Sequence, residues 1–140
     1  MPIQKTLKKM RIMQDRSLFE YAVIRVVPRV EREEFLNVGV VLYCANQKFL
    51  QAVFEINEAR IKAFYPETNI DLLHSYLCAF KLICAADLAG GPISQLPNAE
   101  RFRWLTAARS TMLQTSGVHS GLCTDAKETL EKLYGQLVLG

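Results

Sequence analysis

The side chains best suited to chemistry gather in one segment, residues 109–121. This segment contains an arginine, a glutamine, several hydroxyl groups and one of the two histidines of the chain. Loops held by a rigid scaffold often carry functional side chains. We therefore take Arg109, Gln114, Ser116 and His119 as candidate binding residues.

Two kinds of chemistry would suit the 109–121 segment. Ser116 and His119 could act as a nucleophile and its base, but there is no Gly-x-Ser-x-Gly elbow, and the sequence does not identify an orienting carboxylate. Alternatively, backbone N–H groups near Gly117, Gly121 and the start of the last predicted helix could bind a phosphate or carboxylate, with Arg109 completing the site. The commoner case is a surface loop whose hydroxyls bond their own backbone. We assign no catalytic residue and no cofactor from the sequence.

Histidine and cysteine are too scattered to predict a metal site. His74 and Cys78 are four residues apart and would share a helical face, but a zinc site needs three or four ligands. No Cys-x2-4-Cys pair exists among the four cysteines, Cys44, Cys78, Cys84 and Cys123. Scattered cysteines in apolar surroundings are typical of buried free thiols in a reducing compartment. With no secretory signal and no apolar run near the roughly 20 residues of a membrane span, we predict a cytoplasmic protein without a membrane partner.

Charge divides the chain into a basic N-terminal tail, residues 1–16, and a single α+β domain, residues 17–140. Five basic residues and one acidic residue make the tail strongly positive, whereas the whole chain has a net charge of +3. Residues 17–140 are therefore slightly negative. Nucleic-acid-binding domains carry positive charge on the folded surface, so this distribution disfavours nucleic-acid binding. The tail has apolar residues at helical spacing, but a frayed terminus is the commoner case.

Alternating apolar residues predict three consecutive strands, at residues 19–28, 35–44 and 49–56, and a later strand at 110–114. Short connections between the first three indicate an antiparallel meander. In the second strand, one alternate set is entirely apolar and predicts the core face: Leu36, Val38, Val40, Leu42 and Cys44. The opposite face of the sheet would then display the candidate binding residues Arg25, Asn37 and Tyr43.

Helices are predicted at residues 58–65, 70–86, 100–105 and 126–139, with residues 115–121 as a loop. Because the strands come first and most helices later, the fold class is α+β, with helices packed on one face of the antiparallel sheet. The 70–86 helix is apolar around most of its circumference. Such a helix is buried centrally or covered by a second chain, which makes a homodimer through this helix a candidate assembly.

The mixed face of the sheet allows three interpretations. Aromatic residues around Arg25 resemble the base-stacking surface of sheet-type RNA-binding proteins. Alternatively, later segments could cover the face, with Arg25 paired to Glu55 across the sheet. In a third interpretation the face docks a protein, because aromatic residues and arginine are enriched at the centres of interfaces.

Two segments also match a known pattern: residues 21–28 leading into 34–42, with its Asn-Val-Gly-Val-Val-Leu strand, and the Arg-Ser…Gln-x-Ser-x-x-His-x-Gly loop of residues 109–121. The chain resembles the bacterial family catalogued as domain of unknown function 3037, from about Phe19 to Leu137. Gly117 stands where relatives are expected to have proline. The resemblance implies no activity, but family members are often encoded beside a kinase resembling the HipA toxin, which suggests a protein partner.

We therefore predict a non-enzymatic protein-interaction module, with a HipA-like kinase as one candidate partner. A small enzyme or an anion- or ligand-binding domain centred on residues 109–121 is the alternative, and nucleic-acid binding ranks third.

Overall fold

A long central strand, β1 (Ser17–Val26), organises the sheet in the computed structural model, which describes residues 15–140. One edge of β1 pairs with β2 (Leu36–Cys44), and β2 pairs with β3 (Phe49–Phe54). The other edge pairs with β4 (Leu113–Thr115) and with β5 (His119–Cys123). All these pairings are antiparallel, which confirms the predicted α+β fold with a meander and a later strand. The predicted tail lies almost wholly outside the described residues.

The end of the predicted loop 115–121 is in fact part of a strand, because residues 119–123 pair with Ser17–Tyr21 of β1. Short β4 occupies only the stretch Ile24–Val26 of that edge. The backbone N–H and C=O groups nearer the start of β1 therefore need another partner, and β5 supplies it. Small and polar residues in β5 carry little strand propensity, so pairing with β1 overrides the local signal.

The helices begin close to the predicted residues, and three of them have a side-chain cap. Their bounds are α2 (Glu58–Phe64), α3 (Ile70–Cys84), α4 (Asn98–Leu105) and α5 (Ala126–Tyr134), the last continuing into the π-helical turn η4 (Gly135–Leu139). The caps are Asn57 on α2, Asn69 on α3 and Asp125 on α5, whose side-chain oxygens accept a backbone N–H of the first turn. Such caps satisfy N–H groups that have no partner within the helix.

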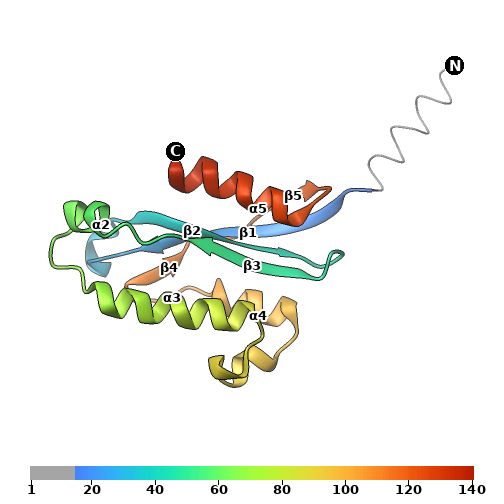
Figure 1. Ribbon diagram of the computed structural model, residues 1–140, viewed down its shortest axis with the longest axis horizontal. Helices are drawn as coiled ribbons and strands as arrows, with labels where there is room; N and C mark the ends of the chain where they lie inside the picture. The colour runs from blue at the N-terminus through green and yellow to red at the C-terminus, as the bar shows by residue number, and fades with distance from the viewer. Residues whose placement is uncertain (1–14) are drawn as a thin grey trace, which may run out of the picture.

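Helices cover both faces of the sheet, whereas the sequence predicted helices on one face only. Figure 1 shows α3 and α4 on one side of the sheet and α5 on the other. The reason is that both alternating sets of the central strands are apolar: Val40 and Val41 are adjacent in β2, and both are fully buried. A sheet that is apolar on both faces must bury both.

Two cores result. The first lies between the sheet and α3 with α4, and its fully buried members include Ile24, Val41, Leu73, Leu77 and Leu105. The second lies between the sheet and α5, and its fully buried members include Val40, Leu42, Cys44, Ala126 and Leu130. The predicted core strip of β2 is therefore divided between two layers instead of facing one.

A β-bulge in the pairing of β1 with β2 explains this division. Ile24 pairs with Gly39 and Arg25 pairs with Asn37, so Val38 has no direct partner in β1. One extra residue changes the phase of the alternation. Leu36 and Val38 consequently pack in the α3 core, whereas Val40, Leu42 and Cys44 pack in the α5 core.

A buried arginine of α4 holds the end of α3. Arg101 donates hydrogen bonds to the carbonyl oxygens of Ile83 (2.6 Å), Cys84 (2.9 Å) and Leu96 (2.8 Å), and also to the side chain of Asn98. The last carbonyls of a helix have no partner within it, and a cation is favourable at that negative end. No pattern in the sequence distinguishes this buried arginine from the exposed arginines near it.

Candidate functional site

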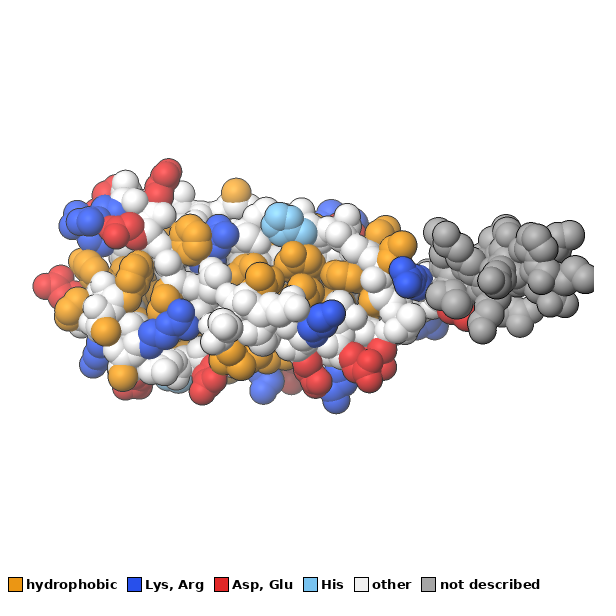
Figure 2. Space-filling model, turned by 90° about the horizontal axis from the view of Figure 1, so that it is seen from above, with side chains coloured by type: hydrophobic (Ala, Val, Ile, Leu, Met, Phe, Trp, Pro, Cys, Tyr) orange, Lys and Arg blue, Asp and Glu red, His pale blue; other side chains and the backbone are white. Residues whose placement is uncertain are grey.

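Helix α5 does not cover the whole of the sheet face on which it packs, so part of that face is left open beside the helix. Helix α5 and turn η4 pack mainly against β2 and β3. Where β1 ends, an open cleft of about 400 Å³ lies between β1, β4 and the loop that leads from β1 to β2. Its lining residues are Arg25, Val27, Val30, Glu33, Phe35, Arg109, Ser110 and Gln114. We call this the Arg25 cleft. Figure 2 looks onto the α5 side, where hydrophobic side chains lie in the middle and most acidic side chains lie at the margins.

The cleft brings together three of the residues that the sequence singled out: Arg25, Arg109 and Gln114. Arg25 and Gln114 are direct partners in the antiparallel pairing of β1 with β4. Arg109 precedes β4 and therefore reaches the same end of β1. Pairing between distant strands thus places these polar side chains around one opening.

Arg25 stacks on an aromatic ring and forms no ion pair with any described residue. Its guanidinium carbon lies 3.9 Å from the centre of the Phe35 ring, a cation–π arrangement. Within residues 15–140 its Nε is buried and has no hydrogen-bond partner. The predicted pair with Glu55 is wrong: the Glu55 carboxylate instead lies 3.4 Å from the hydroxyl of Tyr134 in α5. The pKa of Tyr134 is raised by burial and, secondarily, by this carboxylate.

Arg109 lines the cleft, but much of its hydrogen-bonding capacity is used within the protein. Its guanidinium carbon lies 4.0 Å from the centre of the Trp104 ring, and it donates to the carbonyl oxygens of Trp104 and of Leu105 (3.4 Å). These carbonyls are at the negative C-terminal end of α4, where a cation is stabilising. Burial lowers the pKa of Arg109 from its usual value. Arg109 therefore supplies positive charge to the cleft and also caps the C-terminal end of α4.

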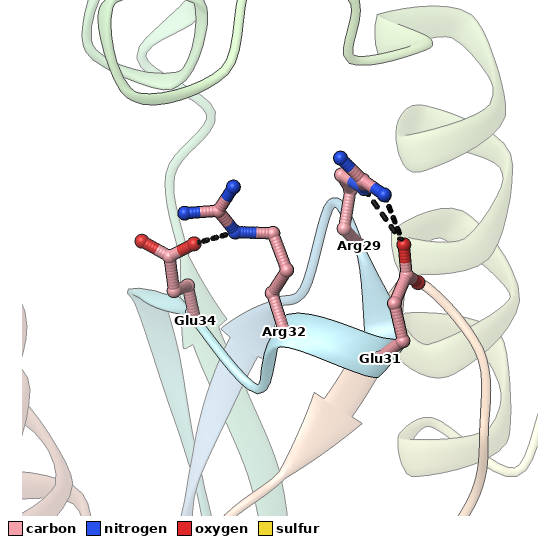
Figure 3. Close-up of polar contacts among 4 residues, drawn as sticks. All are labelled: Arg29, Glu31, Arg32 and Glu34. Atoms are coloured by element: carbon pink, nitrogen blue, oxygen red, sulfur yellow. Dashed lines mark hydrogen bonds and ion pairs between the residues drawn. The ribbon is translucent and has the colours of Figure 1, made fainter.

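Two ion pairs lie in the loop between β1 and β2, beside the cleft. Arg29 pairs with Glu31 at 2.7 Å, and Arg32 pairs with Glu34 (Figure 3). Each pair joins residues two apart in sequence, so the loop neutralises these charges locally. Among the residues that line the Arg25 cleft, the charges are then those of Arg25, Arg109 and Glu33. The balance is one net positive charge.

Ser116 and His119 do not form a nucleophile and base. The Ser116 side chain is buried, its Oγ accepts the N–H of Val23 at 2.8 Å, and its hydroxyl donates to the carbonyl oxygen of Gly117 at 2.9 Å. His119 is exposed, and its ring centre lies 5.3 Å from that of Tyr21. The hydroxyl of Ser116 thus replaces a carbonyl in the ladder of β1, as expected of a hydroxyl that bonds the backbone.

Asn37 and Tyr43 lie apart from the cleft and on opposite faces of the sheet. Tyr43 faces the α4 side, with its ring centre 5.5 Å from that of Phe102. Asn37 faces the α5 side, where its Nδ2 donates to the carbonyl oxygen of Leu137 at 3.1 Å. Asn37 therefore shares the face of Arg25, as predicted, whereas the prediction that Tyr43 shares it was wrong, because the bulge changes the phase of β2 between Asn37 and Tyr43.

The cleft also contains residues that sequence reasoning did not select. Phe35 was expected on the mixed face, but its stacking with Arg25 depends on the bulge that sets Arg25 opposite Asn37. Val30 and Glu33 lie in a connecting loop, where periodicity carries no information about direction. No sequence signal indicates that this loop folds over the end of β1.

Within the described part of the chain, no group of three or more histidine, cysteine, aspartate or glutamate side chains is placed to hold a metal ion. None of the helices formed by residues 15–140 has the length and apolar character needed to cross a membrane. The four cysteines are free, with Cys78 exposed and the other three buried. Burial raises the pKa of the Cys84 thiol to about 12.

The fold and the cleft define a class: an α+β protein whose antiparallel sheet lies between two helical layers, with an arginine-lined cleft beside one of them. A family model described as "Protein of unknown function (DUF3037)" matches residues 21–138, and the chain belongs to that family. No curated protein and no solved structure matches the chain.

Proposed function

We propose that this protein is a non-enzymatic interaction module that docks another protein at the Arg25 cleft, in the cytoplasm. The observation that carries the proposal is an arginine with no described ion-pair partner, stacked on an aromatic ring at an open cleft. Phe35 leaves 43% of its surface exposed although it packs against Arg25. Aromatic residues and arginine dominate the energetic centres of protein interfaces.

The other candidate binding residues support a docking role over an enzymatic one. The hydroxyl of Ser116 is committed to the backbone, and Arg109 is largely committed to the end of α4. Neither arrangement prepares a nucleophile, which requires an adjacent base within hydrogen-bond reach. The same groups hold β4 and its preceding turn in place and therefore shape one wall of the cleft.

The partner can be sought by co-purification of the tagged full-length protein from its host, followed by reconstitution from purified components. A kinase resembling HipA is the first candidate, since the family resemblance suggests it. We expect a stoichiometric complex that Phe35→Ala abolishes. Phe64→Ala is a matched control, because Phe64 is 38% exposed but belongs to α2 and does not line the cleft.

Two results would contradict the proposal. If Phe35→Ala retains the partner as well as Phe64→Ala does, docking occurs elsewhere. If repeated purifications yield no partner that can be reconstituted, the interaction role itself fails. Binding to nucleic acid by a protein lacking residues 1–16, at physiological salt, would instead favour the third hypothesis.

Self-association through α3 is a separate proposal. Leu72 and Tyr76 on this helix are 41% and 37% exposed, which is substantial for large apolar side chains. Light scattering at micromolar concentration should show a dimer that Leu72→Glu dissociates. A monomer at all concentrations would exclude this assembly.

A further inference from the structure

We infer that the Arg25 cleft receives a single carboxylate from an acidic segment of the docked partner. This inference rests on the proposed docking function and specifies its chemistry. It starts from Arg25, whose guanidinium is stacked on Phe35 and forms no ion pair with a described residue. A planar guanidinium offers several N–H donors and matches the geometry of a carboxylate.

The environment of Arg25 makes the binding of a carboxylate to its guanidinium more favourable. Its Nε is already removed from solvent and, within residues 15–140, has no acceptor. A buried donor without a partner is unfavourable, and a carboxylate whose two oxygens reach Nε–H and a neighbouring N–H of the guanidinium would satisfy it. Stacking on Phe35 holds the plane of the guanidinium and reduces the entropy lost on binding.

The charge balance favours a carboxylate over a phosphate. Arg25 and Arg109 are the cations of the cleft, and Glu33 is its acid. Because Arg109 already donates to two carbonyl oxygens of α4, Arg25 is the guanidinium left for a ligand. The net charge of the lining, +1 from two arginines and one glutamate, is balanced by a singly charged group, whereas a phosphate carrying nearly two charges would exceed it and be repelled more strongly by Glu33.

The apolar part of the lining indicates what surrounds the carboxylate. Val27, Val30 and Phe35 form this part of the cleft. An aspartate or glutamate flanked by apolar residues would bury its neighbours against these side chains while its carboxylate reaches Arg25. The volume of about 400 Å³ is at the lower end of the range for ligand pockets and accommodates a few side chains, not a whole folded element.

The test is an NMR titration of the full-length protein that follows the Arg25 side-chain Nε–H and the Gln114 backbone N–H. The probes are the capped peptide acetyl-Gly-Leu-Asp-Leu-Gly-amide, its Asn analogue and inorganic phosphate. We expect the Asp peptide to shift both signals, with binding at least about tenfold weaker for the Asn analogue and for Arg25→Gln. Arg25→Lys should weaken binding less, because it keeps the charge. The exposed Arg103→Gln is the matched control and should bind as the unchanged protein does.

Three results would overturn the inference. They are no shift at Arg25 with the Asp peptide at about 10 mM, equal binding of the Asp and Asn peptides, and tighter binding of phosphate than of the Asp peptide. All three are measured on the unchanged protein, so they do not depend on how a variant folds. If the titration fails but Phe35→Ala still releases a protein partner, docking stands without the carboxylate. If the titration succeeds but no protein partner exists, the carboxylate site stands and the docking proposal fails.

Discussion

Replacing Gly39 by alanine should markedly destabilise the protein, because β2 and β3 leave no room there for a side chain. A Cβ atom at this position would lie 2.5 Å from the carbonyl oxygen of Val53 and 2.6 Å from the Cβ of Phe54. Ordinary van der Waals contact begins near 3.4 Å, so the strands would have to separate by roughly 1 Å. The obstructing atoms belong to or adjoin the β3 backbone and cannot rotate away.

We expect Gly39→Ala to lower the free energy of unfolding by about 3 kcal/mol, the upper end of the usual range for overpacking. For a chain of this size, such a loss should lower the melting temperature by about 10 °C. Gly117→Ala is the matched control, since nothing lies within 4 Å of its added Cβ. It should change stability by less than about 1 kcal/mol, in the stabilising direction, because alanine restricts the unfolded chain more than glycine does.

Urea denaturation followed by circular dichroism measures both variants. Equal stabilities for Gly39→Ala and Gly117→Ala would refute the close approach of β2 and β3 at the bulge. The bulge also sets Arg25 opposite Asn37. The Arg25 Nε–H signal should therefore shift in Gly39→Ala and stay unchanged in Gly117→Ala.

Four further predictions concern stability and thiol chemistry. Arg101→Met should cost about 3 kcal/mol, because it leaves the buried carbonyl oxygen of Cys84 without a donor and removes the hydrogen bond to the carbonyl of Ile83. Exposed Arg103→Met should stay within about 0.5 kcal/mol, and equal urea midpoints for the two variants would contradict this. Ser116→Ala should cost about 1–3 kcal/mol by leaving a buried N–H of β1 unpaired, and an unchanged midpoint would show that this hydroxyl is not needed for the ladder. Below pH 9, a thiol reagent should modify exposed Cys78 rapidly and the three buried thiols only on unfolding, and rapid reaction of all four would refute the burial. Burial raises the pKa of the Cys84 thiol from 9.0 to about 12. The stability that depends on keeping this thiol neutral should therefore be complete below pH 9 and be lost as the pH rises toward 12. Urea denaturation across this pH range measures the loss, with Cys84→Ala as the control.

The positions of the strands and helices follow from local patterns in the sequence. Alternation of apolar residues located β1, β2 and β3, and in the structure an asparagine or aspartate side chain caps the starts of α2, α3 and α5. These signals are readable because each depends on residues within a few positions of one another. Strand β5 had no such signal, since its formation depends on the free edge of β1.

The candidate site was only partly predictable. Arg25, Arg109 and Gln114 were singled out by residue type, and the structure brings them to one cleft. Their meeting required the pairing of β4 with β1, which local periodicity does not reveal. Ser116 and His119 looked equally chemical, but Ser116 completes a strand ladder and His119 lies on the surface.

By itself, the sequence determined the elements other than β5, the antiparallel meander and the identity of the cationic side chains, because residue type and short-range periodicity carry that information. Only the tertiary structure decided which side chains share a face. A single extra residue opposite β1 puts Asn37 on the face opposite Tyr43 and Val38 on the face opposite Val40, whereas strict alternation predicts that each pair shares a face. Alternation along a strand has a period of two, so one inserted residue reverses direction for everything beyond it, and the pairing that accommodates the insertion comes from a different part of the chain.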